Sequence, residues 1–263
     1  MAATTVLQKP AGRLGLRIAA LALALLAWHL FAVGGGTKVE FPTPVQTLQT
    51  FVEQVQLGDF WRAVGNTLLS ANLGLLISVI VGVPLGLFIG SSRPTDKSTT
   101  LLVDFGRFIP SVAVLPVALL MYGGTRKMEL AIIVFGAIWP LLVQSTYAVQ
   151  QVSPQAKSVA RAFHLNRLSV IKDIYVPSAT PFLFTGLRIA ATISLLLAIS
   201  AEFLGGAPGL GKNLADALMV NESRLVFTYA ITSALMGIAL NTILVWVQQK
   251  VLWWHPSVRA EAH

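Results

Sequence analysis

The sequence predicts an all-α, polytopic membrane protein with six transmembrane helices. The 263-residue chain is 55% hydrophobic and only 11% charged, whereas soluble domains carry about 25% charged residues. Its apolar residues gather in stretches long enough to cross a bilayer, which takes about 20 residues per helix. The chain has no cysteine, so disulfides, thiolate chemistry and cysteine-based metal sites are excluded.

Six stretches have the length and apolar content of membrane spans. They are residues 14–33, 66–90, 107–123, 128–150, 179–204 and 226–252. The first follows three basic residues, as a cleaved signal peptide would, but it is long for one and we expect a retained helix. The third is short, and Pro110 lies near its start. We expect an N-terminal tail over 1–13, one membrane domain over 14–254 and a C-terminal tail over 255–263.

Basic residues in the connections indicate which side of the membrane each connection occupies. If the N-terminus lies in the cytoplasm, the cytoplasmic connections and tails contain twelve Lys and Arg residues and the outer connections contain six. Arg188 lies inside a span and completes the nineteen. We therefore expect both termini in the cytoplasm. The net charge of +8 then reflects orientation in the membrane, and we expect no nucleic-acid partner.

Two stretches carry a regular pattern. In the second span, small residues recur every four positions: Ser70, Gly74, Ser78, Gly82, Gly86 and Gly90. Such a stripe lets helix backbones approach closely, either within the subunit or along a pathway or subunit contact. In residues 41–64, apolar side chains recur at helical spacing: Val45, Leu48, Val52, Val55 and Phe60. This spacing predicts an amphipathic helix on the outer surface.

Residues 154–173, PQAKSVARAFHLNRLSVIKD, form the longest polar stretch on the expected cytoplasmic side. Apolar and basic residues alternate through it, and Asn166 is a candidate break between two short helices. A stretch of this kind lies on the membrane surface or presents apolar side chains to a groove on a partner; the residues alone leave both open. Pro177 and Pro181 follow, where we expect the chain to turn into the fifth span.

Five short blocks follow one another in a fixed order: FPTP at 41–44, VGVPLGLFIG at 81–90, IPSVAVLPVALLMYG at 109–123, PSATPFLFTGLRIA at 177–190 and AEFLGGAPGLG at 201–211. This ordered set resembles the membrane permeases of bacterial ATP-binding-cassette (ABC) importers, and most of all the nitrate/sulfonate/taurine/bicarbonate type. The resemblance extends from about residue 41 to the last span.

The resemblance includes a cytoplasmic coupling motif. Permeases of this type carry Glu-Ala-Ala, a Gly four residues beyond the last Ala, and Ile-x-Leu-Pro ten residues after that Gly. Ile174-Tyr175-Val176-Pro177 matches the last part. Ser158-Val159-Ala160 then stands at the Glu-Ala-Ala position and His164 at the Gly position, so the head of the motif departs from the pattern.

The resemblance implies a type I ABC importer permease fold with a coupling-helix loop at 154–173, in a bacterial inner membrane. Separate ATPase subunits would dock on that loop, and a periplasmic or lipid-anchored binding protein would deliver a small, anionic solute. A second permease copy, identical or related, would complete the pathway. The chain itself would be no enzyme and would need no cofactor. The residues implied in coupling are Ser158, Val159, Ala160, Arg161, Ala162, Phe163, His164, Leu165, Asn166 and Pro177.

Polar residues inside the expected spans are candidates to line a pathway: Asn72, Ser78, Ser111, Thr192, Ser194, Glu202 and Asn241. The alternative for each is a hydrogen bond to the backbone or to a neighbouring helix. Arg188 and Glu202 lie about 21 Å apart along one helix and cannot pair. We expect Arg188 to face headgroups or a cavity in the inner half. We expect Glu202, taken as the only acid inside a span, to be a gate group or a clamp on the Gly205-Gly206 loop.

Other functions find little support in the residues. GAPGLGKN at 206–213 nearly spells a phosphate-binding loop, but Asn213 lacks the hydroxyl that binds Mg²⁺ and a membrane span precedes it. The spans hold no acid–base or metal-ligand pair. The rival hypotheses are a secondary transporter or channel, which would have ionisable residues near the bilayer centre and inverted repeats, and a purely structural membrane subunit.

Overall fold

The computed structural model describes residues 10–34 and 41–253, which form helices and no strand. In chain order the helices are α2 (Pro10–Val33), α3 (Pro44–Val55), α4 (Gly58–Gly90), α5 (Arg93–Phe108), η1 (Ser111–Val114), α6 (Leu115–Tyr122), α7 (Arg126–Gln150), α8 (Pro154–Ala162), α9 (Arg167–Val170), η2 (Ile171–Tyr175), α10 (Val176–Gly205), α11 (Leu210–Met219) and α12 (Ser223–Val251). The expected all-α fold is confirmed. Of the expected tails, residues 1–9 and 254–263 lie outside the described residues.

Five continuous helices in the described chain are long and apolar enough to cross a membrane: α2, α4, α7, α10 and α12. The expected third span is different, because it is no single helix over 107–123. It is the second half of a bent pair, α5 and η1–α6, with an angle of 79° between the halves. Pro110 explains the break: the residue before a proline is driven out of the helical region, and Ile109 is extended at ψ 120°.

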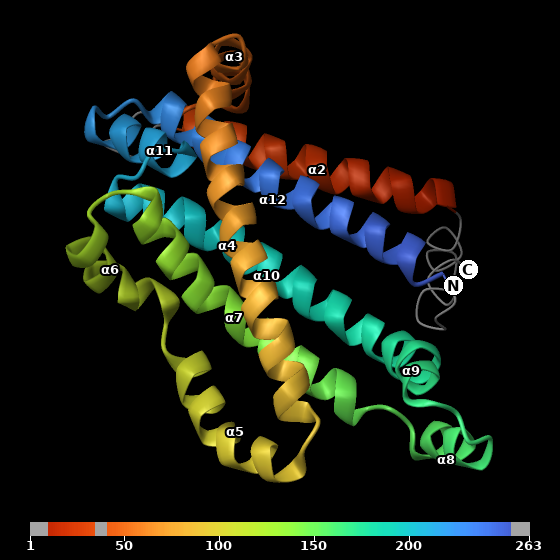
Figure 1. Cartoon of the computed structure of the whole chain (residues 1–263). Helices are drawn as coiled ribbons and strands as arrows, with labels where there is room; N and C mark the ends of the chain where they lie inside the picture. The colour runs from red at the N-terminus through yellow and green to blue at the C-terminus, as the bar shows by residue number, and fades with distance from the viewer. Residues whose placement is uncertain (1–9, 35–40, 254–263) are drawn as a thin grey trace.

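The small-residue stripe of α4 packs against α7 within the chain. A Cβ on Gly82 would meet the Ile138 and Leu141 side chains, and one on Gly86 would meet the Leu142 carbonyl. Thr146 of α7 donates across this contact to the Gly86 carbonyl at 3.1 Å. The stripe therefore serves helix packing, the first of its two readings. Together α4, α7 and α10 form the centre of the bundle (Figure 1).

The predicted amphipathic helix is shorter than its apolar pattern. Helix α3 ends at Val55, and Phe60 belongs to α4, where it is buried. Thr43 opens α3 with a reciprocal capping box that Gln46 completes, an arrangement that stabilises a helix start. The pattern misled at Phe60 because helical spacing continues by chance across the short turn before Gly58.

The two ends of the bundle carry different elements (Figure 1). Helices α8 and α9 lie at one end, hereafter the coupling end, together with the start of α2 and the end of α12. Helices α3 and α11 lie at the other, hereafter the distal end. Because α2 begins and α12 ends at the same end of the bundle, the chain crosses the bundle an even number of times between these two points.

The turn into the fifth span does not occur at the prolines. The break lies at residues 163–166, between α8 and α9, and from Arg167 the chain is helical through η2 into α10. Pro177 lies in the first turn of α10, where its missing N–H breaks no hydrogen bond that a helix start would make. The π-helix η2 precedes it, with the Val176 N–H bonded to the Ile171 carbonyl, so the wider turn accommodates the proline without a hinge.

Candidate functional sites: the coupling segment and the face of helix α10

The coupling segment, residues 153–175, is built from two capped short helices. The Ser153 hydroxyl accepts a hydrogen bond from the Ala156 N–H at 3.0 Å and starts α8. The Asn166 side chain accepts one from the Ser169 N–H at 2.7 Å and starts α9. Side chains of this type satisfy the free N–H groups of a first turn. The expected break at Asn166 is confirmed.

His164 holds the position between these two helices at which the resembling permeases have glycine. Its φ is +50°, in the left-handed region that glycine enters without strain and His, Asn and Asp enter more often than other residues. The Leu165 N–H closes the turn on the Ala160 carbonyl at 3.0 Å. The tight turn is therefore present although the glycine is not.

The coupling segment presents apolar side chains to its surroundings. Phe163 is 74% exposed and Val159 52%, while of the residues 158–166 only Ala160 is buried. Leu168 is 75% exposed and Ile171 54%; these two continue the same surface and were not among the residues assigned to coupling. Their apolar character beside four basic residues was the available signal. Arg161 donates to the Ser158 hydroxyl at 3.2 Å, and Pro177 is half-buried in α10.

The second candidate site is the exposed face of α10. A pocket of about 480 Å³ on one side of it is lined by Thr185, Arg188, Ile189, Thr192, Ile193, Asn241 and Gln248. Arg188 donates to the Asn241 side-chain oxygen at 2.9 Å. Arg188 has no acidic partner among the described residues. Arg188 therefore lines a pocket, one of the two surroundings expected for it, and its position in the inner half of the membrane stays a prediction.

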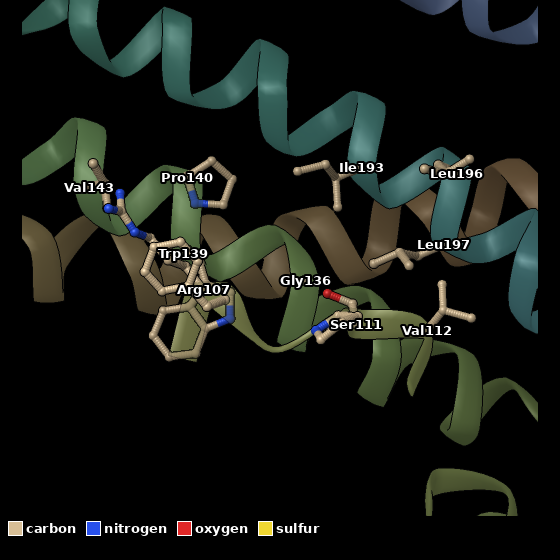
Figure 2. A pocket seen from close by; sticks show the side chains of 12 residues that line it. Arg107, Ser111, Val112, Gly136, Trp139, Pro140, Val143, Ile193, Leu196 and Leu197 are labelled. Carbon is tan, nitrogen blue, oxygen red and sulfur yellow. The ribbon is translucent and has the colours of Figure 1, made fainter. Parts of the chain in front are cut away.

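A larger pocket, of about 550 Å³, lies on the other side of α10 and shares Ile193 with the first. It occupies the bend between α5 and η1 and is walled by α7 and α10 (Figure 2). Its walls are mainly apolar, with Ser111 facing Gly136. Trp139 also lines it, and its indole N–H is buried without a hydrogen-bond partner in the described structure.

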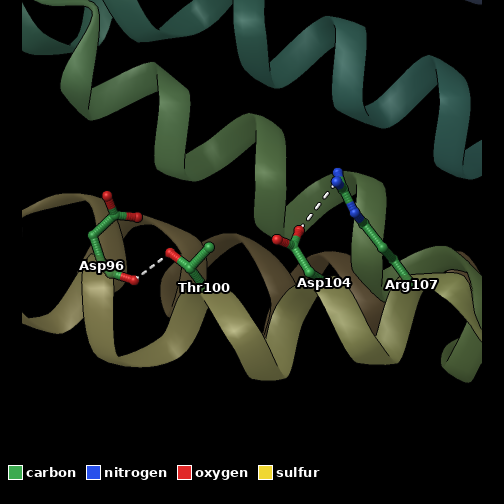
Figure 3. A network of polar contacts seen from close by, with 4 residues as sticks. All are labelled: Asp96, Thr100, Asp104 and Arg107. Carbon is green, nitrogen blue, oxygen red and sulfur yellow. Dashed lines mark hydrogen bonds and ion pairs between the residues drawn. The ribbon is translucent and has the colours of Figure 1, made fainter.

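Three charged side chains of α5, those of Asp96, Asp104 and Arg107, line a pocket between α5 and α7. Arg107 lines the larger pocket and pairs with Asp104 at 3.0 Å, and Thr100 donates to the Asp96 carbonyl at 2.6 Å (Figure 3). The apolar side chains of α5 are the exposed ones, with Leu101 at 78%. Helix α5 therefore turns polar side chains toward α7 and apolar side chains away from the bundle.

The structure divides the predicted pathway residues into three groups. Ser111, Thr192 and Asn241 line the two pockets beside α10. Ser78, Ser194 and Glu202 are buried within the chain, and Asn72 is exposed on α4. Most are bonded to their own backbone four residues earlier: Asn72, Ser78, Thr192 and Ser194. Their assignment to a pathway stays a prediction.

Glu202 lies at the distal end, beneath the loop that joins α10 to α11. Its carboxylate accepts the Gly211 N–H at 2.8 Å and the Thr67 hydroxyl at 2.9 Å. Contrary to expectation, it is not the only acid inside the helical core: Glu129 of α7 is 1% exposed and accepts the Ser70 hydroxyl. Glu129 stands in the first turn of the apolar helix α7, and this position was the signal that the sequence analysis missed.

Comparison with known proteins decides between the hypotheses. Residues 82–252 match the family described as "Binding-protein-dependent transport system inner membrane component". The chain belongs to this family. It is thus the permease, the membrane component of an importer that works with an ATPase and a binding protein, and neither a secondary transporter or channel nor an enzyme.

Curated relatives cover nearly all of this permease. It is 28% identical to the bicarbonate transport system permease protein CmpB of Synechococcus elongatus over 87% of this chain and 86% of the relative. It is 28% identical to the nitrate import permease protein NrtB of Synechocystis, over 89% and 87%. It is 25% identical to the putative aliphatic sulfonates transport permease protein SsuC of Bacillus subtilis, over 92% and 88%.

Solved structures share the fold of the permease. An inward-facing MetNI methionine ABC transporter matches with a TM-score of 0.61 at 17% identity, over 77% of this chain and 95% of the other. A bacterial ABC transporter involved in the import of the acidic polysaccharide alginate matches with a TM-score of 0.60 at 17% identity, over 91% and 97%. The expected ABC importer permease fold is confirmed.

Proposed function

We propose that this permease imports a small anion along the exposed face of α10, between itself and a second copy of the chain. The observation that carries the substrate class is Arg188. It lies 12 residues into the 30-residue helix α10, about 18 Å from the helix start. A cation at that depth is costly against lipid and normally faces a cavity or partner. With only the amide of Asn241 as a partner, its charge is available to an anion.

The relatives support the same substrate class. Bicarbonate, nitrate and aliphatic sulfonates, named for the three relatives, are all anions. A guanidinium pairs well with planar or tetrahedral oxyanions because its donors form a rigid fork. We therefore expect an oxyanion, and a pathway that includes Ser111, Thr192 and Asn241.

Substitution of Arg188 tests this proposal. In vesicles containing the complete importer, Arg188→Gln should lower uptake of the preferred anion at least about tenfold, the equivalent of one charge-assisted hydrogen bond, while Arg188→Lys retains part of it. Uptake of labelled nitrate, bicarbonate and methanesulfonate is measured. Arg62→Gln is the matched control, because Arg62 is an exposed arginine at the distal end that pairs with Asp59. Wild-type uptake by Arg188→Gln, or uptake of a neutral solute alone, would contradict the proposal.

We further propose that both termini lie in the cytoplasm, that the ATPase binds the exposed apolar side chains of the coupling segment, and that two identical copies pair. Burial of apolar side chains such as Phe163 in a partner groove would provide the main binding energy, at about 25 cal/mol per Å². The self-paired form is favoured because symmetric dimers are the commonest assemblies. A pair of this chain with a related permease is the alternative.

One purification tests both partners. Two differently tagged copies are expressed with the ATPase, and one tag is captured. Wild type should retain the other copy and the ATPase; Phe163→Asp should retain the copy and lose the ATPase, because a charge enters an apolar groove. Met219→Asp, which alters an equally exposed side chain at the distal end, should retain both. An intact complex with Phe163→Asp would show that the segment lies on the membrane surface, and loss of the second copy from wild type would indicate a heterodimer.

A further inference from the structure

Two buried carboxyl groups at the distal end take no part in the functions above. Glu202 of α10 is 0% exposed and Glu129 of α7 is 1% exposed. Hydroxyls one turn apart on α4 hold them: Thr67 donates to Glu202 Oε2 at 2.9 Å, and Ser70 donates to Glu129 Oε2. Because Thr67 and Ser70 are three residues apart, about 4.5 Å along the axis of α4, the two carboxyls that they hold lie near each other. Three helices therefore bring two acids together in an interior that excludes water.

The hydrogen bonds to each carboxyl are one-sided. Glu202 Oε2 accepts both the Thr67 hydroxyl and the Gly211 N–H, at 2.8 Å for the latter. The Oε1 atoms of Glu202 and Glu129 are both buried and have no hydrogen-bond partner among the described residues. An ionised carboxylate spreads its charge over two acceptor oxygens, and leaving one of them buried without a donor is costly. A proton on the unpartnered oxygen removes the buried charge, and a neutral carboxyl costs less to bury there than a carboxylate.

No basic side chain neutralises the pair within the described residues. Arg126, in the first turn of α7, acts on Glu129 electrostatically, but it forms no ion pair and donates to the Asn66 side chain at 2.9 Å. The other charged side chains at this end of α4 and α11 are exposed and paired with each other: Asp59 with Arg62, and Lys212 with Asp216. The negative charge of the pair is therefore neutralised by a bound cation. We take this cation to be a proton, because each carboxyl has an oxygen without a hydrogen-bond partner.

The pair lies directly under the loop between α10 and α11. The Leu210 N–H donates to the Thr67 hydroxyl at 3.0 Å, so the same hydroxyl contacts both Glu202 and the loop. A Cβ on Gly209 would collide with the Glu202 carboxyl, and one on Gly211 with the Glu202 Cβ. The loop therefore rests on Glu202, and the charge of Glu202 bears on whether the loop stays in place.

We propose that Glu129 and Glu202 form a proton-binding pair that holds at least one proton at neutral pH and keeps the α10–α11 loop on α4. When both carboxyls are ionised, two like charges are buried near each other, each with an unpartnered oxygen, which favours separation of the two carboxyls and entry of water. The loop is then released from Thr67. Proton occupancy would thus set how firmly the distal end of the permease is closed.

Infrared spectroscopy of the complete complex tests proton occupancy directly. Difference spectra of wild type minus Glu129→Gln and wild type minus Glu202→Gln at neutral pH should contain the C=O stretch of a protonated carboxylic acid, shifted in D₂O. Titration of wild type to alkaline pH should remove that band. Glu53→Gln, which alters an exposed acid on α3, should give no such band. Difference spectra with carboxylate bands alone, or Gln variants that fail to fold at neutral pH, would overturn the proposal, since Gln is the neutral isostere.

Labelling of introduced cysteines tests whether the loop is released. The chain has no native cysteine, so the label on this chain reports the introduced position alone. Leu210→Cys is a buried probe under the loop, and Met219→Cys, on the same helix, is 82% exposed at the native residue. The ratio of their labelling rates should rise several-fold from neutral to alkaline pH. In the double variant Glu129→Gln/Glu202→Gln, the ratio of labelling rates should stay low at both neutral and alkaline pH. A labelling ratio that does not change with pH in wild type would overturn the proposal. A ratio that changes with Na⁺ concentration rather than with pH, at constant ionic strength, would also overturn it and would indicate that the pair binds a metal cation.

Discussion

At the scale of single residues, His164 is where the coupling segment departs furthest from the pattern of the permeases it resembles. The backbone keeps a left-handed conformation there, with φ +50°. This conformation costs a residue with a Cβ about 1 kcal/mol relative to glycine. The loss of the motif's glutamate at Ser158 and of its glycine at His164 therefore leaves the fold of the segment unchanged. What the segment offers a partner is its apolar surface.

His164 provides the residue-scale prediction. His164→Gly should keep ATPase binding and raise the stability of the turn by about 1 kcal/mol, whereas His164→Val should weaken binding, because a β-branched side chain is strained at positive φ. Substrate-stimulated ATP hydrolysis and co-purification of the ATPase are measured. Ala162→Val, on the last turn of α8, is the control for added bulk. Equal behaviour of His164→Val and wild type would show that the turn is unimportant for docking.

At the scale of elements, the contact of α4 with α7 depends on glycine. Gly86 and Gly90 lie against the Leu142 and Thr146 carbonyls of α7, closer than any side chain would permit. In a bilayer, helices gain little from the hydrophobic effect, so this close packing is a main source of their association.

Gly86 provides the element-scale prediction. Gly86→Val should lower the stability of the detergent-solubilised permease by about 1–3 kcal/mol, as overpacking of an interior does, and should reduce the yield of folded protein. Gly65→Val on the same helix should have no such effect, because a Cβ at Gly65 meets nothing within 4 Å. Thermal unfolding of the two variants is compared. Equal melting temperatures would show that α4 and α7 can separate without loss.

At the scale of the whole molecule, orientation depends on the distribution of basic residues. In the expected topology, twelve of them fall on the side of the coupling segment and six on the opposite side. The coupling end also carries the start of α2 and the end of α12 (Figure 1). A bias of this size sets the orientation of most membrane proteins.

Reporter fusions test this orientation. A fusion after residue 165 should report the cytoplasm, because it lies between α8 and α9, and one after residue 214, within α11, should report the outside. A fusion after residue 40 should also report the outside. This fusion tests separately whether the first span crosses the membrane. A cytoplasmic signal at 214 would contradict six crossings and both cytoplasmic termini.

Local sequence signals account for much of the fold. The spans followed from apolar runs of bilayer length, and the short helices around Asn166 followed from amphipathic spacing and a capping residue, all of which act between residues close in the chain. The small-residue stripe of α4 predicted a close helix contact, but it did not identify α7 as the partner helix. Arg188 was expected at a cavity because a charge in a span has few other places to go.

What the sequence alone determined was therefore the class of protein, its spans and the composition of its coupling segment. The structure showed the 79° break at Pro110 and the continuous helix through Pro177, whereas the meeting of Glu129 with Glu202 was decided by the tertiary structure alone. The meeting of the two acids depends on contacts between residues far apart in the chain, such as Thr67 and Glu202, which are 135 positions apart. A pattern of neighbouring residues carries no record of which distant side chain completes a hydrogen bond, so the packed chain was needed to find the pair.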